Sequence, residues 1–96
     1  MSMRWVAMAS DFALWRGDKA FMKTLMPGVR ATLNGFQARF IDAEGFVDVK
    51  GKMDFMDWVD GWEHGAPPES YTGVSGMMNW QLALVLTNAA DLEEYM

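Results

Sequence analysis

The residues best suited to chemistry lie in one stretch, residues 53–68, with the sequence MDFMDWVDGWEHGAPP. Two tryptophans, Trp58 and Trp62, stand there among carboxylates. An indole face can stack on the apolar C–H face of a sugar ring, and carboxylates accept hydrogen bonds from its hydroxyls. A glycosidase also needs two carboxyl groups beside the scissile bond, and Asp57 or Asp60 could supply one of them. The residue types of the stretch are therefore compatible with a carbohydrate-binding loop, as one of several interpretations.

Two interpretations without a bound ligand remain open, one for the tryptophans and one for His64. Trp58 and Trp62 are four residues apart and could pack beneath the loop as a small second core, with the acids facing water. His64 stands beside Glu63, Asp57 and other acids, but one histidine among carboxylates has no recognised metal-ligand spacing. A solvated or capping histidine is the simpler interpretation. We predict no metal site and no cofactor, and the stretch carries no nucleotide-binding glycine pattern.

Composition limits the classes of protein to which the chain can belong. Its 96 residues allow one domain with a modest core, so residues 1–96 are taken as one unit. Half of the residues (51%) are hydrophobic and 14% are aromatic, which excludes a disordered chain. A net charge of −5 without a basic stripe argues against a nucleic-acid partner. No apolar run predicts a membrane span, no cysteine is present, and nothing indicates a localisation.

The elements around the loop are predicted to be helices, which makes the fold class all-α. Apolar residues recur at steps of three and four over residues 3–16, 19–41 and 75–95. Gly17 is a natural helix stop, and the next residue, Asp18, is a natural N-cap, so the first two helices should form a hairpin. Pro27 should bend the second helix or start a new one. Residues 44–73 should form an irregular excursion, with a short strand or β-hairpin suggested by Phe46, Val47 and Val49.

Each helix has an apolar stripe that is predicted to face the core. In the first helix the stripe is Trp5, Met8, Phe12 and Trp15. In the second it is Phe21, Leu25, Val29, Leu33, Phe36 and Phe40, and in the third it is Met77, Trp80, Leu84, Ala89 and Leu92. Three such helices do not close a core by themselves. We therefore expect a segment of a larger protein, or a chain that forms a homo-oligomer.

Four stretches of the chain resemble the bacterial α-L-rhamnosidases, which are six-hairpin glycosidases. In order, they are SDFALWRGDKAFMKTLMPGVRATLNGF, IDAEGFVDV, FMDWVDGWEHGAPPES and NWQLALVLTNAADLEE, and together they cover nearly the whole chain. The most specific element is Phe55-Met56-Asp57-Trp58, followed by Trp62, Gly65 and Pro67.

The resemblance implies that the chain is a central segment of an (α/α)₆ barrel whose end loops build a sugar pocket. It also implies inverting hydrolysis of a rhamnosyl glycoside by an acid and a base. In the family those two groups lie upstream and downstream of this segment, so no catalytic residue is assigned here. Asp57 and Trp58 match the family's substrate-pocket loop, and Trp62 is assigned with them as a substrate-binding residue. The segment alone should be inert.

Two alternatives to this function are kept. The chain could be a small acidic helical interaction module that acts as a dimer. It could also belong to a six-hairpin glycosidase that acts on another sugar, because related enzymes of that architecture act on glucosides or uronides.

Overall fold

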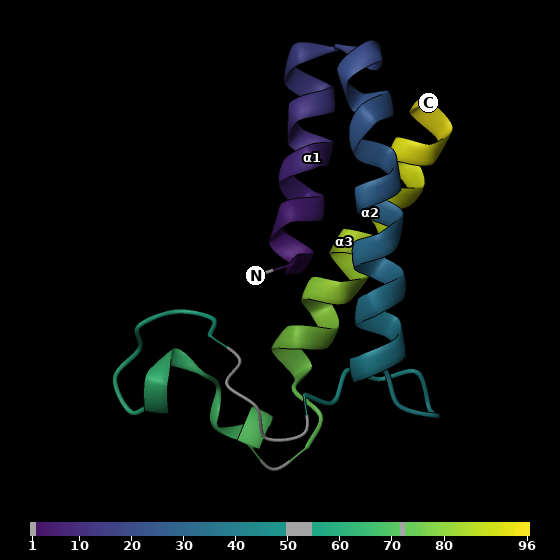
Figure 1. Ribbon diagram of the computed structural model, residues 1–96. Coiled ribbons are helices and arrows are strands. Elements are labelled where there is room, and N and C mark those ends of the chain that lie inside the picture. The colour runs from purple at the N-terminus through teal and green to yellow at the C-terminus, as the bar shows by residue number, and fades with distance from the viewer. Residues whose placement is uncertain (1, 50–54, 72) are drawn as a thin grey trace.

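The fold is all-α, with three long helices and an irregular connection before the third (Figure 1). A computed structural model describes residues 2–49, 55–71 and 73–96. Helix α1 spans Ser2–Arg16, α2 spans Lys19–Phe40 and α3 spans Gly76–Tyr95. Two short 3₁₀ turns, η1 (Glu63–Gly65) and η2 (Pro68–Tyr71), lie in the connection. The predicted helix positions are confirmed to within one or two residues.

The turn between α1 and α2 forms for the reasons that the sequence predicted. Gly17 takes a left-handed backbone (φ 64°), and its N–H donates to the carbonyl of Ala13 at 3.0 Å. The Asp18 carboxylate accepts the N–H of Phe21 at 2.9 Å and caps α2. Helix α3 is capped in the same way by the Ser75 hydroxyl, which accepts the N–H of Met78.

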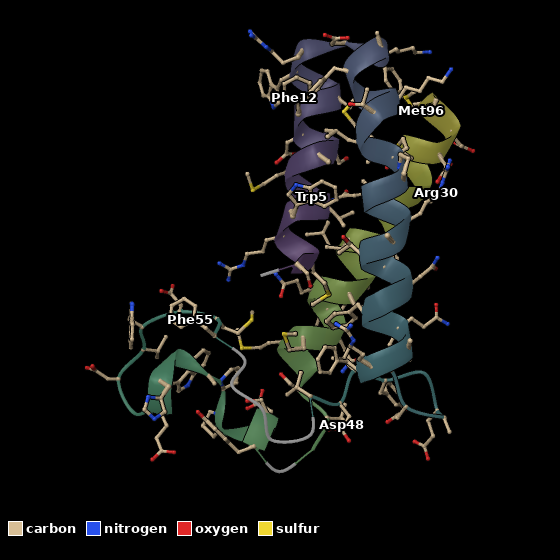
Figure 2. The ribbon with its side chains drawn as sticks, viewed as in Figure 1. Trp5, Phe12, Arg30, Asp48, Phe55 and Met96 are labelled. Carbon is tan, nitrogen blue, oxygen red and sulfur yellow. The ribbon has the colours of Figure 1, made fainter. Side chains whose placement is uncertain are left out.

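Helix α2 continues through Pro27 as one α-helix, so the alternative of a new helix beginning there is wrong. The neighbouring Gly28 allows α1 to approach closely. A Cβ atom at Gly28 would lie 3.0 Å from Cη2 of Trp5, so the indole rests on bare backbone. The Trp5 ring therefore lies between α1 and α2 (Figure 2).

Helix α1 packs against both other helices, and its buried face differs from the predicted one. The residues buried on α1 are apolar and all smaller than tryptophan: Met3, Val6, Ala9 and Ala13. Trp15 is 82% exposed and Met8 is 65% exposed, so the predicted stripe was wrong for both residues. The narrow space between the helices takes Val and Ala side chains, and the larger Trp15 ring stays outside.

The other two stripes were only partly right. On α2, Val29 and Phe36 are buried as predicted, but the interior also takes Met22 and Met26, while Phe21 is exposed. Phe21 instead meets the edge of the Phe12 ring, with 5.2 Å between the ring centroids.

On α3, Ala89 and Leu92 are buried as predicted. Met77, Trp80 and Leu84 are exposed, because the buried stripe lies on an adjacent face of the helix. That buried stripe consists of Met78, Leu82, Val85, Ala89 and Leu92.

After α2 the chain reverses direction, and none of the described residues there forms a strand. Two isolated antiparallel bridges join Ile41 to Val47 and Asp48 to Val74. The pairing does not extend into the expected strand at residues 46–49: the Asp48 N–H donates to the carbonyl of Phe40 at 2.7 Å, but the neighbouring backbone donor is bonded to a side chain. The Val47 N–H donates to Oδ1 of Asn79 at 2.9 Å, and Val47 is buried against α3.

Candidate functional site

The predicted sugar-binding residues lie on a loop at the lower end of the helices, which we call the aromatic–acidic loop (residues 55–71, Figure 1). The start of the loop is joined to its middle through one acceptor. The N–H groups of Met56 and Asp57 both donate to the carbonyl of Gly65, at 2.8 and 3.1 Å. The guanidinium of Arg4 donates to the carbonyl of Met56 at 2.9 Å and ties the loop to α1. These bonds fix the backbone that precedes Trp58.

Gly65 is a point of close packing in the loop. Its φ of +72° lies in the left-handed region that favours glycine. A Cβ atom at Gly65 would lie 2.5 Å from Cε2 of Phe55 and 2.8 Å from the carbonyl oxygen of Asp57. The Phe55 ring therefore covers the Gly65 backbone, and Figure 2 shows Phe55 at this point of the loop.

His64 takes an uncommon backbone conformation next to that contact. Its φ of 52° and ψ of 26° lie in the left-handed region, which costs a non-glycine residue about 1–2 kcal/mol. The turn around it is held from outside, since the Tyr71 hydroxyl donates to the carbonyl of Glu63 at 2.6 Å. The His64 side chain is exposed.

The three predicted binding residues differ from one another in how far they are exposed. Trp58 is 78% exposed, and its ring meets the edge of Phe55 with the centroids 5.2 Å apart. Asp57 is exposed beside it, and its Oδ1 accepts the N–H of Trp58 at 2.7 Å. Trp62 is half-buried. The alternative in which both indoles pack beneath the loop is therefore wrong for Trp58.

The described residues meet the requirements of neither a metal site nor a membrane-spanning helix. Among residues 2–49, 55–71 and 73–96, no three His, Asp or Glu side chains are grouped closely enough to hold a metal ion. Within the same residues, no helix is long and apolar enough to cross a membrane. Asp54, one of the acids of the predicted site, lies outside the described residues.

A pocket of about 400 Å³ lies away from the loop, between α1 and the second half of α3. We call it the α1–α3 groove. Its apolar lining comes from Ala13, Leu14 and Leu92, and its polar lining is Ser10, Asp11, Asn88, Asp91 and Tyr95, with Gly17 at one end. None of these residues was predicted from the sequence to form a site. The signal that could have found them is the placement of acids among apolar positions of two neighbouring helices.

One ion pair lies outside both regions and joins α2 to α3. Nε and Nη2 of Arg30 donate to Oε1 and Oε2 of Glu93, at 2.6 and 2.7 Å (Arg30 is labelled in Figure 2). The hydrogen bonds from Arg30, together with its charge, lower the pKa of Glu93 below its ordinary value. The same pairing raises the pKa of Arg30. This forked contact bridges α2 and α3, which pack mainly through α1.

Comparisons of the chain with protein families, with curated proteins and with solved structures find no match. The function must therefore be argued from the residues and their geometry.

Proposed function

We propose that the chain is a segment of a glycoside hydrolase of the α-L-rhamnosidase type and that its aromatic–acidic loop forms one wall of the sugar site. The observation that carries the proposal is the pairing of Trp58 and Asp57 on a fixed backbone. The Trp58 indole is largely exposed, and the Asp57 carboxylate lies next to it in the chain. The sequence resemblance supports the same assignment.

The chemistry of the pair suits a deoxysugar. A methyl group and a C–H face favour contact with an indole, whereas hydroxyls favour a carboxylate acceptor. Oδ1 of Asp57 already accepts the Trp58 N–H, and Oδ2 has no hydrogen-bond partner among the described residues. Oδ2 is thus the atom that we assign to a sugar hydroxyl. Phe55 sets the tilt of the indole through its edge contact.

Fixed backbone geometry supports a binding role over a merely solvated loop. Exposed loops are usually mobile, and a mobile tryptophan loses much of its stacking energy to ordering. Here Met56 and Asp57 are both bonded to Gly65, and Met56 is bonded to Arg4. The indole is thus presented by a backbone that is ordered before any ligand arrives.

The proposal assigns binding and no catalysis to this chain. Inversion needs two carboxyl groups roughly 6.5–9.5 Å apart with a water between them. The role of Asp57 is to bind the sugar, so neither the acid nor the base is assigned here. One stacked indole contributes on the order of 1 kcal/mol beyond area burial. We therefore expect binding no tighter than about millimolar and no hydrolysis of an aryl rhamnoside by the isolated chain.

Titration of the chain with L-rhamnose, followed by tryptophan fluorescence, tests the proposal. We expect weak, saturable quenching that Trp58→Phe removes and Asp57→Ala weakens. Trp15→Phe is the matched control, because Trp15 is exposed to the same extent but lies on α1. Equal quenching with glucose or glucuronate would change the sugar assignment. Quenching that survives in Trp58→Phe, or disappears in Trp15→Phe, would refute the assignment of the loop.

A further inference from the structure

The α1–α3 groove combines an apolar floor with acidic side chains. Leu14 lines it and is 81% exposed, so the apolar surface is open to a partner. Asp11 from α1 and Asp91 from α3 line the same groove, which puts a carboxylate on each helix. Neither carboxylate has a hydrogen-bond or ion-pair partner among the described residues. The groove therefore has two acids that are not neutralised within the structure described.

A contact within the chain shows that one aromatic residue of the groove can bind a cation. Nζ of Lys19 lies 4.6 Å from the centroid of the Tyr95 ring, and Tyr95 lines the groove. A cation over an aromatic ring is held by the negative face of the ring. Tyr95 is thus a groove residue whose ring already contacts an ammonium group, although Lys19 itself does not line the groove.

The apolar surface extends along α3 beyond the groove. Trp80 is 81% exposed and Leu84 is 57% exposed, and with Met77 they recur at steps of three and four. Such spacing places them on one side of the helix. A second hollow beside Trp80 is lined by Gly76, Asn79 and Ala83. Two helices therefore present an elongated, largely apolar surface that carries negative charge.

We propose that this surface binds an amphipathic helix whose apolar stripe is flanked by Lys or Arg. The space between two packed helices fits a third helix, whose side chains at i, i+3 and i+7 would enter the groove. Its cations would pair with Asp11 and Asp91. Charge argues against a second copy of this chain as the occupant, because the net charge of −5 is self-repelling. The inference does not depend on sugar binding by the aromatic–acidic loop.

Two designed helices of about four turns, built from Leu and Lys or from Leu and Glu, serve as probes. Both place Leu on one face, so they differ only in the sign of the flanking charge. Binding of the labelled peptides to the full chain is measured by fluorescence anisotropy. We expect the Lys helix to bind roughly fivefold to tenfold more tightly than the Glu helix.

Variants then locate the site. Asp11→Asn with Asp91→Asn should remove most of the preference for the Lys helix. The control, Asp60→Asn with Glu63→Gln, changes the net charge equally on the aromatic–acidic loop and should preserve it. Leu14→Glu removes apolar surface and adds a carboxylate, so it should weaken the Glu helix more than the Lys helix. Because Leu14 is exposed, the variant should keep its helical circular dichroism.

Three outcomes would overturn the proposal. The first is equal affinity for the two helices, and the second is equal loss of preference in the two double variants. The third is concentration-dependent dimerisation that Leu14→Glu abolishes, which would make a second copy the occupant. Rhamnose quenching in Asp11→Asn with Asp91→Asn should match the unmodified chain, so a failure of either proposal can be recognised separately.

Discussion

The helices and the aromatic–acidic loop are ordered by opposite means. Between the helices, long or branched side chains fill the interior, and Met22, Val6 and Val85 are almost completely buried. In the loop the buried residues are small or rigid (Gly65, Ala66, Pro67 and Ser70), while Trp58 stays outside. The helices are thus stabilised by close packing of their buried side chains. The loop is stabilised by backbone hydrogen bonds and by one position where a side chain is missing.

This difference predicts opposite sensitivities. Removing atoms should damage the helical part most, because a cavity is left in a packed interior. Adding an atom should damage the loop most, because the contact between Gly65 and Phe55 leaves no room for a Cβ. Surface charge should matter least in both parts.

The largest expected effect comes from Met22→Ala, which removes a fully buried side chain from the first turn of α2. We expect the free energy of unfolding to fall by about 2–5 kcal/mol, as measured by urea denaturation. The matched control is Met8→Ala on α1, because Met8 is 65% exposed, and it should change stability by less than about 0.5 kcal/mol. Equal losses in the two variants would show that the assigned interior is wrong.

An intermediate effect is expected from Gly65→Ala. A left-handed backbone costs alanine about 1–2 kcal/mol, and displacement of Phe55 should add about 1–3 kcal/mol. The amides of Met56 and Asp57 should exchange faster with solvent, as measured by hydrogen exchange. Gly61→Ala is the control in the same loop: its φ of +86° is also left-handed, but nothing lies within 4 Å of the added Cβ. If both variants behave alike, the contact with Phe55 does not order the loop.

The smallest expected effect concerns the ion pair of Arg30 and Glu93, whose side chains are both about half exposed. The pKa of Glu93 is lowered in the folded chain, so its contribution is complete above the ordinary carboxyl pKa. It is lost as the pH falls through the lowered value. The melting temperature of Glu93→Gln should therefore lie slightly below that of the unmodified chain near neutral pH, and the difference should vanish in acid. Glu94→Gln, which removes a neighbouring carboxylate, should show no such convergence.

Local signals in the sequence were sufficient for the helices and their ends. Gly17 and Asp18 specify a stop and a cap through their own backbone and side-chain chemistry, and both act as predicted. The inward faces were harder to predict, because α1 and α3 are apolar on more than one side. On α1 the series with Trp5 and Met8 and the series with Val6 and Ala9 have equally regular spacing. Which series is buried depends on how closely the neighbouring helices approach, and that is a property of the assembled fold.

The loop shows a similar limit. The sequence predicted that Trp58 and Asp57 share a loop, and the structure adds that the indole is exposed. What no pattern predicted is how its backbone is held, since Arg4 comes from the first helix and Gly65 from the end of η1. Contacts between residues far apart in sequence leave no periodic signal. The α1–α3 groove was missed for the same reason.

The methionines buried between the helices make the interior chemically vulnerable. A thioether is flexible enough to fill irregular space, but oxidation turns it into a polar sulfoxide. Met22, Met26 and Met78 are buried, whereas Met8 and Met77 are exposed. A peroxide should therefore modify the exposed pair first and leave the fold intact. Modification of the buried sulfurs requires the helices to separate, and a sulfoxide formed there would oppose their repacking, so oxidative damage to this chain becomes self-reinforcing once it reaches the interior.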